Sequence, residues 1–258
     1  IGARAVVIRS QPAWMVCAGN PARPLKPRLH PHSDHILLVM PESLLQISIT
    51  GAPPAGLYGW QNPAPTYSQS YINPPLLKLL LAVQPGRLLD LGCGNGSLCR
   101  FLHSHGLDVV GMEPDADGVR FAKEQLPSTP LYQLGVDSDP ALITEQEGLF
   151  DAVVSTEVIE HLYAPHLLPR FAWHCLRPGG LLIVTTPHHG YLKNLALSVA
   201  DKWDHHHTAL WHGGHIKFWS RTTLTQLLAK EGFVAERFLG VGRVPWLWKS
   251  MILVMRKP

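Results

Sequence analysis

Cysteine is scarce in this chain, and long apolar runs are missing. The sequence of 258 residues contains four cysteines, none of them in a CxxC pair, at positions 17, 93, 99 and 175. This spacing argues against a disulfide framework and against a cysteine-based metal site, and it fits a reducing cytoplasm. No run of about eighteen uncharged apolar residues is present, which is the length that crosses a bilayer. We therefore expect a cytoplasmic protein without a membrane span.

The chain also lacks a large excess of charge of one sign. Twenty-two Lys and Arg residues and nineteen Asp and Glu residues leave a net charge of +3 that is spread along the chain. A protein that binds nucleic acid usually carries a basic stripe or patch, so we do not expect nucleic acid as a partner. Histidine, in contrast, is abundant. Seven of the fifteen histidines lie between His188 and His215.

From residue 84 to residue 258, short apolar runs alternate with helical patterns, which is typical of a parallel sheet with helices on both faces. Strands are predicted at residues 87–91, 108–112, 130–134, 150–155, 180–186, 234–239 and 250–256. Helices are predicted to begin near Pro74 with Asn73 as the cap, near Asp139-Pro140, and at Ser220 with an end at Gly232. No long helical pattern separates the last two strands, so they should form an antiparallel hairpin. The sequence therefore predicts an α/β fold with a mixed seven-stranded sheet.

The first 65 residues follow a different pattern. Residues 1–28 include Ala18-Gly19-Asn20-Pro21-Ala22 and a basic tail, and they resemble the C-terminal end of hexapeptide-repeat acyltransferases. A single coil of such a β-helix cannot bury its apolar side without stacked repeats. The resemblance therefore implies an acyltransferase fused upstream or a relic of one, with an ordinary N-terminal extension as the alternative. Residues 29–65, with one apolar stretch at 36–40, are interpreted as a linker, and residues 66–258 as the main domain.

A glycine-dense turn follows the first strand of the main domain. Gly92, Gly94 and Gly96 form a GxGxG pattern in which the missing Cβ atoms let the backbone approach a ligand. Ser97 stands where a dinucleotide fingerprint requires a further glycine, which disfavours a pyrophosphate ligand. The second strand ends at Glu113, whose carboxylate is expected to accept the two hydroxyls of a ribose.

An acidic motif with a histidine follows the fourth strand. Glu157, Glu160 and His161 stand in an i, i+3, i+4 relation, so on a helical turn they would share one face. Two carboxylates repel each other unless a positive charge lies between them, and two acids with an imidazole make a plausible half-site for a divalent cation.

Taken in order, these motifs resemble the class I S-adenosylmethionine-dependent methyltransferases, and the resemblance covers residues 66–258. It implies a Rossmann-like fold with S-adenosyl-L-methionine across the strand ends. Asp90 and the Gly92–Gly96 loop would lie near the methionine part of the cofactor, and Glu113 would bind its ribose. Val136 and Asp137 would lie at its adenine.

The motif at 157–161, together with the segment Gly213-Gly214-His215-Ile216-Lys217-Phe218, is similar to metal-dependent O-methyltransferases. That group includes the ubiquinone-biosynthesis enzymes and the small-RNA 3'-terminal ribose methyltransferases. The resemblance implies that Mg²⁺ or another divalent cation is held by Glu157, Glu160, His161 and His215. The alternative is that His161 orients the cofactor or the acceptor, while the carboxylates cap the following helix.

Other histidines belong to a long insertion at residues 191–219, which exceeds an ordinary connection and contains Trp203, Trp211 and Trp219. It is interpreted either as a lid over the acceptor or as a core patch. His188, directly after the fifth strand, is a second candidate base beside His161. His103 and His105 are expected on the surface and His174 in a helix before Pro178, and none of the three is expected to be a ligand.

These observations lead to a functional hypothesis. The chain should transfer a methyl group from S-adenosylmethionine to a hydroxyl of a small molecule or a glycan precursor, with help from a divalent metal. The alternatives are an RNA 3'-terminal ribose methyltransferase and a metal-independent small-molecule methyltransferase with a histidine base. A binding module without activity is disfavoured, because the chain keeps both the glycine loop and Glu113.

Overall fold

The computed structural model describes residues 15–18, 23–27, 58–207, 211 and 213–258. The chain forms two compact units, residues 1–50 and residues 51–258. In the first unit, strand β1 (Met15–Ala18) pairs antiparallel with strand β2 (Arg23–Pro27). The apolar stretch at 36–40 and residues 19–22 lie outside the described residues.

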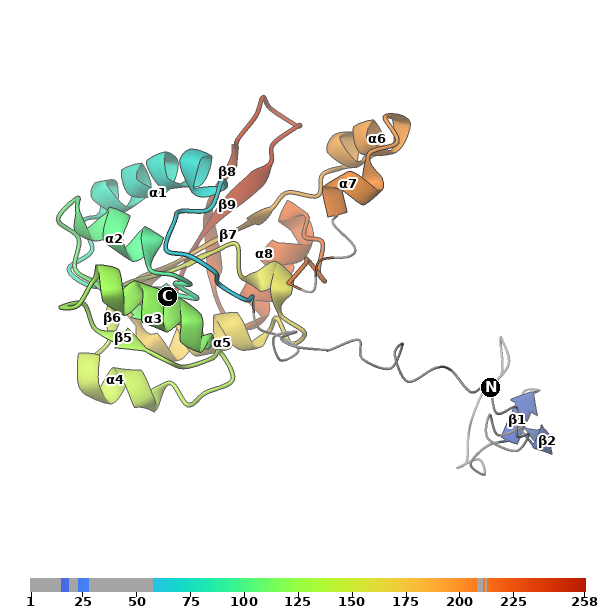
Figure 1. Ribbon diagram of the computed structural model, residues 1–258, viewed down its shortest axis with the longest axis horizontal. Helices are drawn as coiled ribbons and strands as arrows, with labels where there is room; N and C mark the ends of the chain where they lie inside the picture. Colours follow the sequence, from blue (N-terminus) through green and yellow to red (C-terminus); the bar gives the residue numbers. More distant parts are fainter. Residues whose placement is uncertain (1–14, 19–22, 28–57, 208–210, 212) are drawn as a thin grey trace, which may run out of the picture. The chain divides into compact units, whose positions relative to one another are not determined.

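The second unit is built on a seven-stranded sheet with the order β5-β4-β3-β6-β7-β9-β8 (Figure 1). Its strands are β3 (Leu88–Leu91), β4 (Val109–Met112), β5 (Leu131–Tyr132), β6 (Phe150–Thr156), β7 (Leu176–Pro187), β8 (Val234–Val241) and β9 (Ser250–Arg256). Strands β3 to β7 are parallel, and β9 runs antiparallel to both of its neighbours, β7 and β8. The predicted mixed sheet and its antiparallel hairpin are confirmed. Strand β7 begins at Leu176, earlier than residue 180.

Helices cover both faces of this sheet (Figure 1). They are α1 (Gln69–Val83), α2 (Ser97–His103), α3 (Ala116–Gln125), α4 (Ala141–Glu147), α5 (Leu167–Cys175), α6 (Tyr191–Val199), α7 (Trp203–His207) and α8 (Arg221–Lys230). Alternate side chains of a strand enter different cores: Leu88 packs with residues of α1 and α2, and Leu89 with residues of α4, α5 and α8. Among the described residues, no helix is long and apolar enough to cross a membrane.

The prediction that a helix begins near Pro74 with Asn73 as its cap is wrong. Helix α1 begins at Gln69, so that Asn73, Pro74 and Pro75 lie inside it. Proline removes a backbone donor and normally disfavours a helix interior. Here the helix buries the side chains of residues 72, 76, 79 and 80 in the core, and this tertiary packing outweighs the local cost.

Helix α8 begins where the sequence predicted. The Ser220 hydroxyl accepts a hydrogen bond from the Thr223 backbone N–H at 3.2 Å, and the Ser220 backbone N–H donates to the Thr223 hydroxyl at 3.1 Å. This capping box satisfies backbone donors that have no partner within the helix.

Replacing Ser220 with alanine should therefore lower the free energy of unfolding by about 1 kcal/mol. Urea denaturation measures the change. Thr222→Ala, an exposed substitution in the same helical turn that leaves the capping box intact, is the matched control. Equal losses in the two variants would contradict a role for the cap.

Candidate active site

The turn after β3 brings backbone into close contact with an aromatic side chain. Gly94 has a φ of +55°, and a Cβ atom there would lie 2.1 Å from Cζ2 of Trp60. The glycine pattern predicted a close approach to a ligand; in the structure the close neighbour of Gly94 is the Trp60 ring. Gly92 and Gly96 also have positive φ values, and their missing Cβ atoms make room for Val158 and Ala122.

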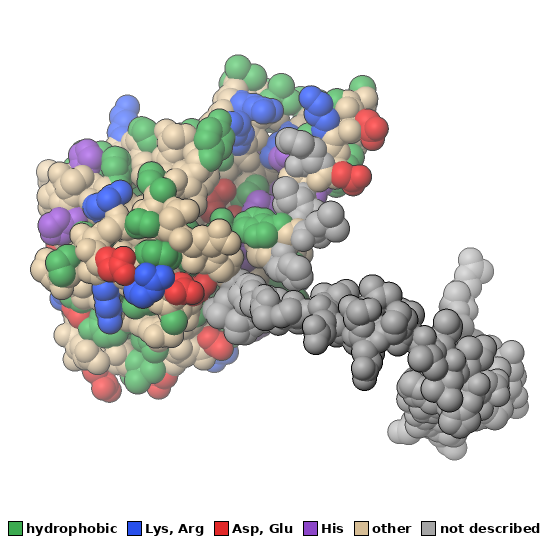
Figure 2. Space-filling model, viewed as in Figure 1, with side chains coloured by type: hydrophobic (Ala, Val, Ile, Leu, Met, Phe, Trp, Pro, Cys, Tyr) green, Lys and Arg blue, Asp and Glu red, His purple; other side chains and the backbone are tan. Residues whose placement is uncertain are grey.

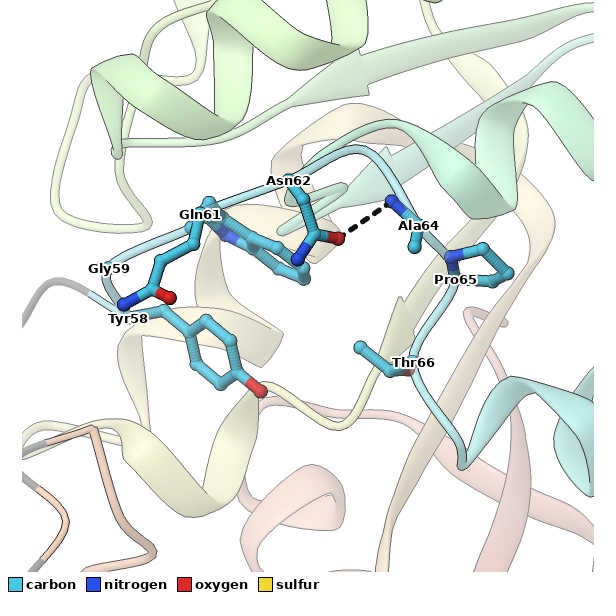
Figure 3. A pocket seen from close by; sticks show the side chains of 8 residues that line it. Tyr58, Gly59, Gln61, Asn62, Ala64, Pro65 and Thr66 are labelled. Carbon is cyan, nitrogen blue, oxygen red and sulfur yellow. Dashed lines mark hydrogen bonds between the residues drawn. The ribbon is translucent and has the colours of Figure 1, made fainter.

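Trp60 belongs to a segment, residues 58–66, that runs along the glycine turn (Figure 3). The Asn95 side-chain amide donates to the backbone carbonyls of Asn62 at 3.0 Å and Ala64 at 2.8 Å. The Trp60 indole N–H is buried and has no partner among the described residues. Sequence reasoning missed Trp60, because it falls in the stretch interpreted as a linker. The sequence signal that could have identified it is the neighbouring aromatic residue Tyr58, whose ring packs against Trp60.

Glu113, the residue predicted to bind the ribose, lies beside this turn. Its carboxylate accepts hydrogen bonds from the backbone N–H groups of Gly94 at 2.9 Å and Asp115 at 3.0 Å. Burial raises the pKa of Glu113 to about 7. Asp90 is fully buried, accepts a hydrogen bond from the Cys99 thiol, and has one carboxylate oxygen without a partner among the described residues.

Val136 and Asp137, the predicted adenine contacts, follow strand β5. Val136 is partly buried against the core, and Asp137 is exposed. Neither residue lines the large cavity that Glu113 and Gly92 line.

The acidic motif does not form one helical turn, so that prediction is wrong. Glu157 has a φ of +54°, which breaks the path between β6 and the short 3-10 helix Ile159–His161. Its carboxylate accepts hydrogen bonds from the hydroxyls of Thr185 at 3.0 Å and Ser250 at 3.1 Å. Glu157 thus turns toward β7 and β9 and does not share a helical face with Glu160.

Three of the four predicted metal ligands do come together. One ligand atom each from Glu160, His161 and His215 lies within 4.8 Å of the others, and Glu157 is not part of this group. We call these three residues the ligand cluster. The Glu160 backbone carbonyl accepts hydrogen bonds from Ile216 at 2.9 Å and Lys217 at 3.0 Å, which holds the loop that carries His215 against the 3-10 helix.

The Glu160 carboxylate is buried with only one of its oxygens satisfied. Oε2 accepts a hydrogen bond from the Thr186 hydroxyl at 2.9 Å. Oε1 has no hydrogen-bond partner among the described residues and lies 4.0 Å from Nε2 of His161. An unsatisfied buried carboxylate oxygen is costly, and a bound cation would relieve that cost.

The protonation states of the ligand cluster suit a cation. Burial lowers the pKa of His161, and burial together with His161 lowers the pKa of His215 to about 4. Both imidazoles are therefore neutral at pH 7, and the contact between His161 and Glu160 is not an ion pair. Burial and the nearby Glu157 raise the pKa of Glu160 well above its usual range, so cation binding there would displace a proton.

The structure places the second candidate base away from this cluster. The buried His188 ring packs against Phe238 and Trp248, with ring centroids 6.2 and 5.4 Å away, and it does not line the large cavity. His189 packs against His207 and Phe218. His103 and His105 are exposed, as expected, and His174 is exposed as well. His212 lies outside the described residues.

A single cavity of about 1270 Å³ joins the two parts of the site. Gly92 and Glu113 line one part of it, and His161 and His215 line another. Helix α6, at the start of the predicted lid, also contributes to its wall. Figure 2 shows acidic and histidine side chains at the base of a hollow in this unit. We call the cavity of about 1270 Å³ the acceptor cavity.

Comparison with known proteins identifies the class. The family described as "Methyltransferase domain" matches residues 67–237. The solved methyltransferase domain of a bacterial CtHen1-CN covers 71% of this chain and 96% of its own at 22% identity and a TM-score of 0.53. The [4+2]-cyclase SpnF covers 77% of this chain and 85% of its own at 18% identity and a TM-score of 0.56. The chain belongs to the class I S-adenosylmethionine-dependent methyltransferases, as the motifs predicted.

Within this class, the chain is similar to ubiquinone biosynthesis O-methyltransferases. The enzyme of Xanthomonas campestris pv. campestris is 30% identical over 190 residues, which is 69% of this chain and 79% of that enzyme. The mitochondrial enzyme of Mus musculus is 33% identical over 138 residues, which is 48% of this chain. The chain spans 37% to 56% of the length of the mitochondrial enzymes from mouse, rat and human.

Proposed function

We propose that this chain transfers a methyl group from S-adenosylmethionine to a hydroxyl group of a small molecule or a glycan precursor, with help from a divalent cation. The observation that carries the proposal is the shared cavity. The glycine turn and Glu113 line the same space as two members of the ligand cluster, His161 and His215. A cofactor at the glycine turn and an acceptor hydroxyl at the ligand cluster would therefore lie in the same cavity.

The residues around the glycine turn fit the cofactor. The cradle at Gly94 has no room for a Cβ atom, and it is lined by buried polar atoms of Glu113 and Trp60. S-adenosylmethionine supplies an electrophilic methyl group on its sulfonium. We propose that Asp90, Gly92, Gly94 and Gly96 position the methionine part, that Glu113 accepts the ribose hydroxyls, and that Val136 and Asp137 flank the adenine. Transfer then requires that the acceptor oxygen is held in line with the methyl group and the sulfonium sulfur.

The ligand cluster fits a divalent cation, which would lower the pKa of an acceptor hydroxyl. Glu160, His161 and His215 would hold it, and Glu157 joins them only if its side chain leaves Thr185 and Ser250. One carboxylate with two imidazoles suits a borderline transition cation better than Mg²⁺, which prefers oxygen ligands. Without a cation, the neutral imidazole of His161, which lines the cavity, would act as the base, with His188 as the second candidate.

Assays of S-adenosylhomocysteine release test this function directly. The enzyme is incubated with S-adenosylmethionine and a panel of catechols, diols and sugars, with Mg²⁺, with Mn²⁺ or with EDTA. Release that depends on the metal supports the full proposal. Release that is unchanged by EDTA favours the metal-independent form with His161 as base. Release only with RNA oligonucleotides favours 3'-terminal ribose methylation.

Glu113 provides a separate test of cofactor binding. Glu113→Ala should weaken binding of S-adenosylhomocysteine by about 1.5 to 3 kcal/mol, because a hydrogen bond to a charged group is lost. Isothermal titration calorimetry measures the loss. Glu124→Ala, an exposed change on the neighbouring helix α3, should leave the affinity unchanged. An unchanged affinity in Glu113→Ala would remove Glu113 from the site.

We also propose that residues 1–28, the remnant that resembles an acyltransferase end, take no part in methyl transfer. Removal of these residues should leave cofactor affinity and turnover within about twofold of the full chain, because the glycine turn and the ligand cluster belong to residues 51–258. A large loss of either property would assign the segment to the active domain.

A further inference from the structure

Four basic side chains line the acceptor cavity; Lys202 is exposed, and the other three come from two segments of the chain. Lys193 comes from helix α6, Arg243 follows strand β8, and Lys249 directly precedes strand β9, and all three line the cavity. In Figure 2, Lys and Arg side chains gather along the upper edge of the hollow. Helix α6 and the connection between β8 and β9 therefore both bring positive charge to this cavity.

Lys193 is buried, which is unusual for a lysine. Its ammonium donates hydrogen bonds to the backbone carbonyls of His188 at 3.0 Å and Lys249 at 3.3 Å. These two bonds leave one N–H of the ammonium without a partner among the described residues. Burial, and then repulsion from Arg243, lower the pKa of Lys193 to about 8, so it still carries its charge at pH 7.

Lys249 is held in place by two tyrosines. Its ammonium donates a hydrogen bond to the Tyr67 hydroxyl at 2.7 Å and lies 4.4 Å from the centre of the Tyr67 ring and 5.3 Å from that of Tyr71. The hydrogen bond and the charge of Lys249 lower the pKa of Tyr67, and Arg243 lowers it further. Arg243 thus acts on the pKa values of both Tyr67 and Lys193, which contact Lys249 through hydrogen bonds.

These cations lack acidic partners. None of the ion pairs among the described residues involves Lys193, Arg243 or Lys249. The acid that acts on Lys193 is Glu157, and its carboxylate is already engaged by the hydroxyls of Thr185 and Ser250. Concentrated positive charge against a low-dielectric wall favours binding of an anion.

We propose that Lys193, Arg243 and Lys249 form an oxyanion subsite of the acceptor cavity, which binds a carboxylate or phosphate group of the methyl acceptor. The proposal rests on the methyltransferase function proposed above and names the class of its acceptor. The subsite and two members of the ligand cluster line one cavity, whose lining also includes apolar side chains such as Leu162, Leu197 and Leu247. The acceptor is accordingly an amphipathic molecule with a hydroxyl at one end and an acidic group at the other.

A pair of fluorescent probes tests the subsite without any turnover. 1-Anilinonaphthalene-8-sulfonate and N-phenyl-1-naphthylamine share one ring system and differ only in the sulfonate. The full chain should bind the sulfonate at least about tenfold more tightly, because the anion gains charge-assisted hydrogen bonds. Arg243→Gln and Lys249→Gln should each lower the affinity for the sulfonate probe by about three- to tenfold. The affinity for the neutral probe should change by less than about twofold. Retained binding of the neutral probe shows that each variant is folded.

Lys230→Gln, an exposed change at the end of helix α8 that removes the same charge away from the cavity, is the control. Displacement of the bound sulfonate by benzoate or by phenyl phosphate identifies the acidic group as carboxylate or phosphate. The proposal is overturned if both probes bind equally, if the two cavity variants behave like Lys230→Gln, or if benzyl alcohol displaces the sulfonate as well as both anions do. Because no cofactor is present, these outcomes are independent of whether the chain transfers a methyl group.

Discussion

Replacement of Gly94 by alanine should lower the affinity for S-adenosylhomocysteine by at least about 100-fold, which corresponds to about 2.7 kcal/mol. The φ of +55° strains any residue other than glycine, and the new Cβ atom would lie 2.1 Å from the Trp60 ring. The ring and the turn must then separate, which alters the place where the methionine part of the cofactor is proposed to lie. Calorimetric titration with S-adenosylhomocysteine measures the effect.

Gly106→Ala separates backbone strain from loss of the cradle. Gly106 has a φ of +80°, yet a Cβ atom there would meet nothing within 4 Å. This variant should lose about 1 to 2 kcal/mol of stability from its left-handed backbone and keep its cofactor affinity. If Gly94→Ala and Gly106→Ala lower both properties equally, the glycine turn is structural only, and the cofactor lies elsewhere.

The second large effect is expected at Glu160. Glu160→Gln should lower kcat/KM for the true acceptor by about 100-fold or more. The reason is that a cation at the ligand cluster would stabilise the transition state by several kcal/mol. Cofactor affinity should stay within about twofold. The fold should persist as well, because the Glu160 carboxyl is buried with a strongly raised pKa and glutamine has nearly the same shape.

Metal titration gives this prediction a readout besides turnover. Calorimetry with Mn²⁺ should show one site in the full chain and no binding in Glu160→Gln or His215→Ala. Glu145→Gln, an exposed change on helix α4, should bind Mn²⁺ as the full chain does. If Glu160→Gln turns over at the original rate in EDTA, the metal takes no part in the reaction, and His161 is left as the base.

The pH dependence of metal binding follows from the same groups. The imidazole of His215 has a pKa of about 4, and burial also lowers that of His161, so neither needs to lose a proton at neutral pH. Burial raises the pKa of Glu160, so over the pH range in which its carboxyl is protonated, cation binding must displace that proton. Affinity for Mn²⁺ should therefore rise by about tenfold for each pH unit while Glu160 remains protonated in the free enzyme, and then level off. Affinity that is flat across neutral pH would show that Glu160 is already ionised.

Several features were predictable because they depend on local pattern. The strands of the sheet alternate with helices, and their apolar runs are strong enough to be recognised from the sequence. The last hairpin follows from the missing helix between β8 and β9. The start of α8 was predictable because Ser220 caps the helix with its own neighbours. The ordered motifs also identified the class of enzyme.

The geometry of the acidic motif was not predictable in this way. The spacing of Glu157, Glu160 and His161 suggested a shared helical face, yet the left-handed backbone at Glu157 breaks that geometry. Nothing in the residue types signals this break, since a non-glycine residue adopts positive φ only where its surroundings stabilise it. Here the hydroxyls of Thr185 and Ser250, from two other strands, hold the Glu157 carboxylate.

The sequence by itself determined the sheet, the glycine turn and the residue types of the site, because hydrophobic periodicity, backbone freedom and ligand chemistry are properties of short stretches. Only the tertiary structure decided that Trp60 packs on Gly94, that the ligand cluster omits Glu157, and that Lys193, Arg243 and Lys249 line one cavity. The physical reason is that each of these contacts joins segments far apart in the chain. Their geometry comes from packing around the common core, which no local pattern encodes.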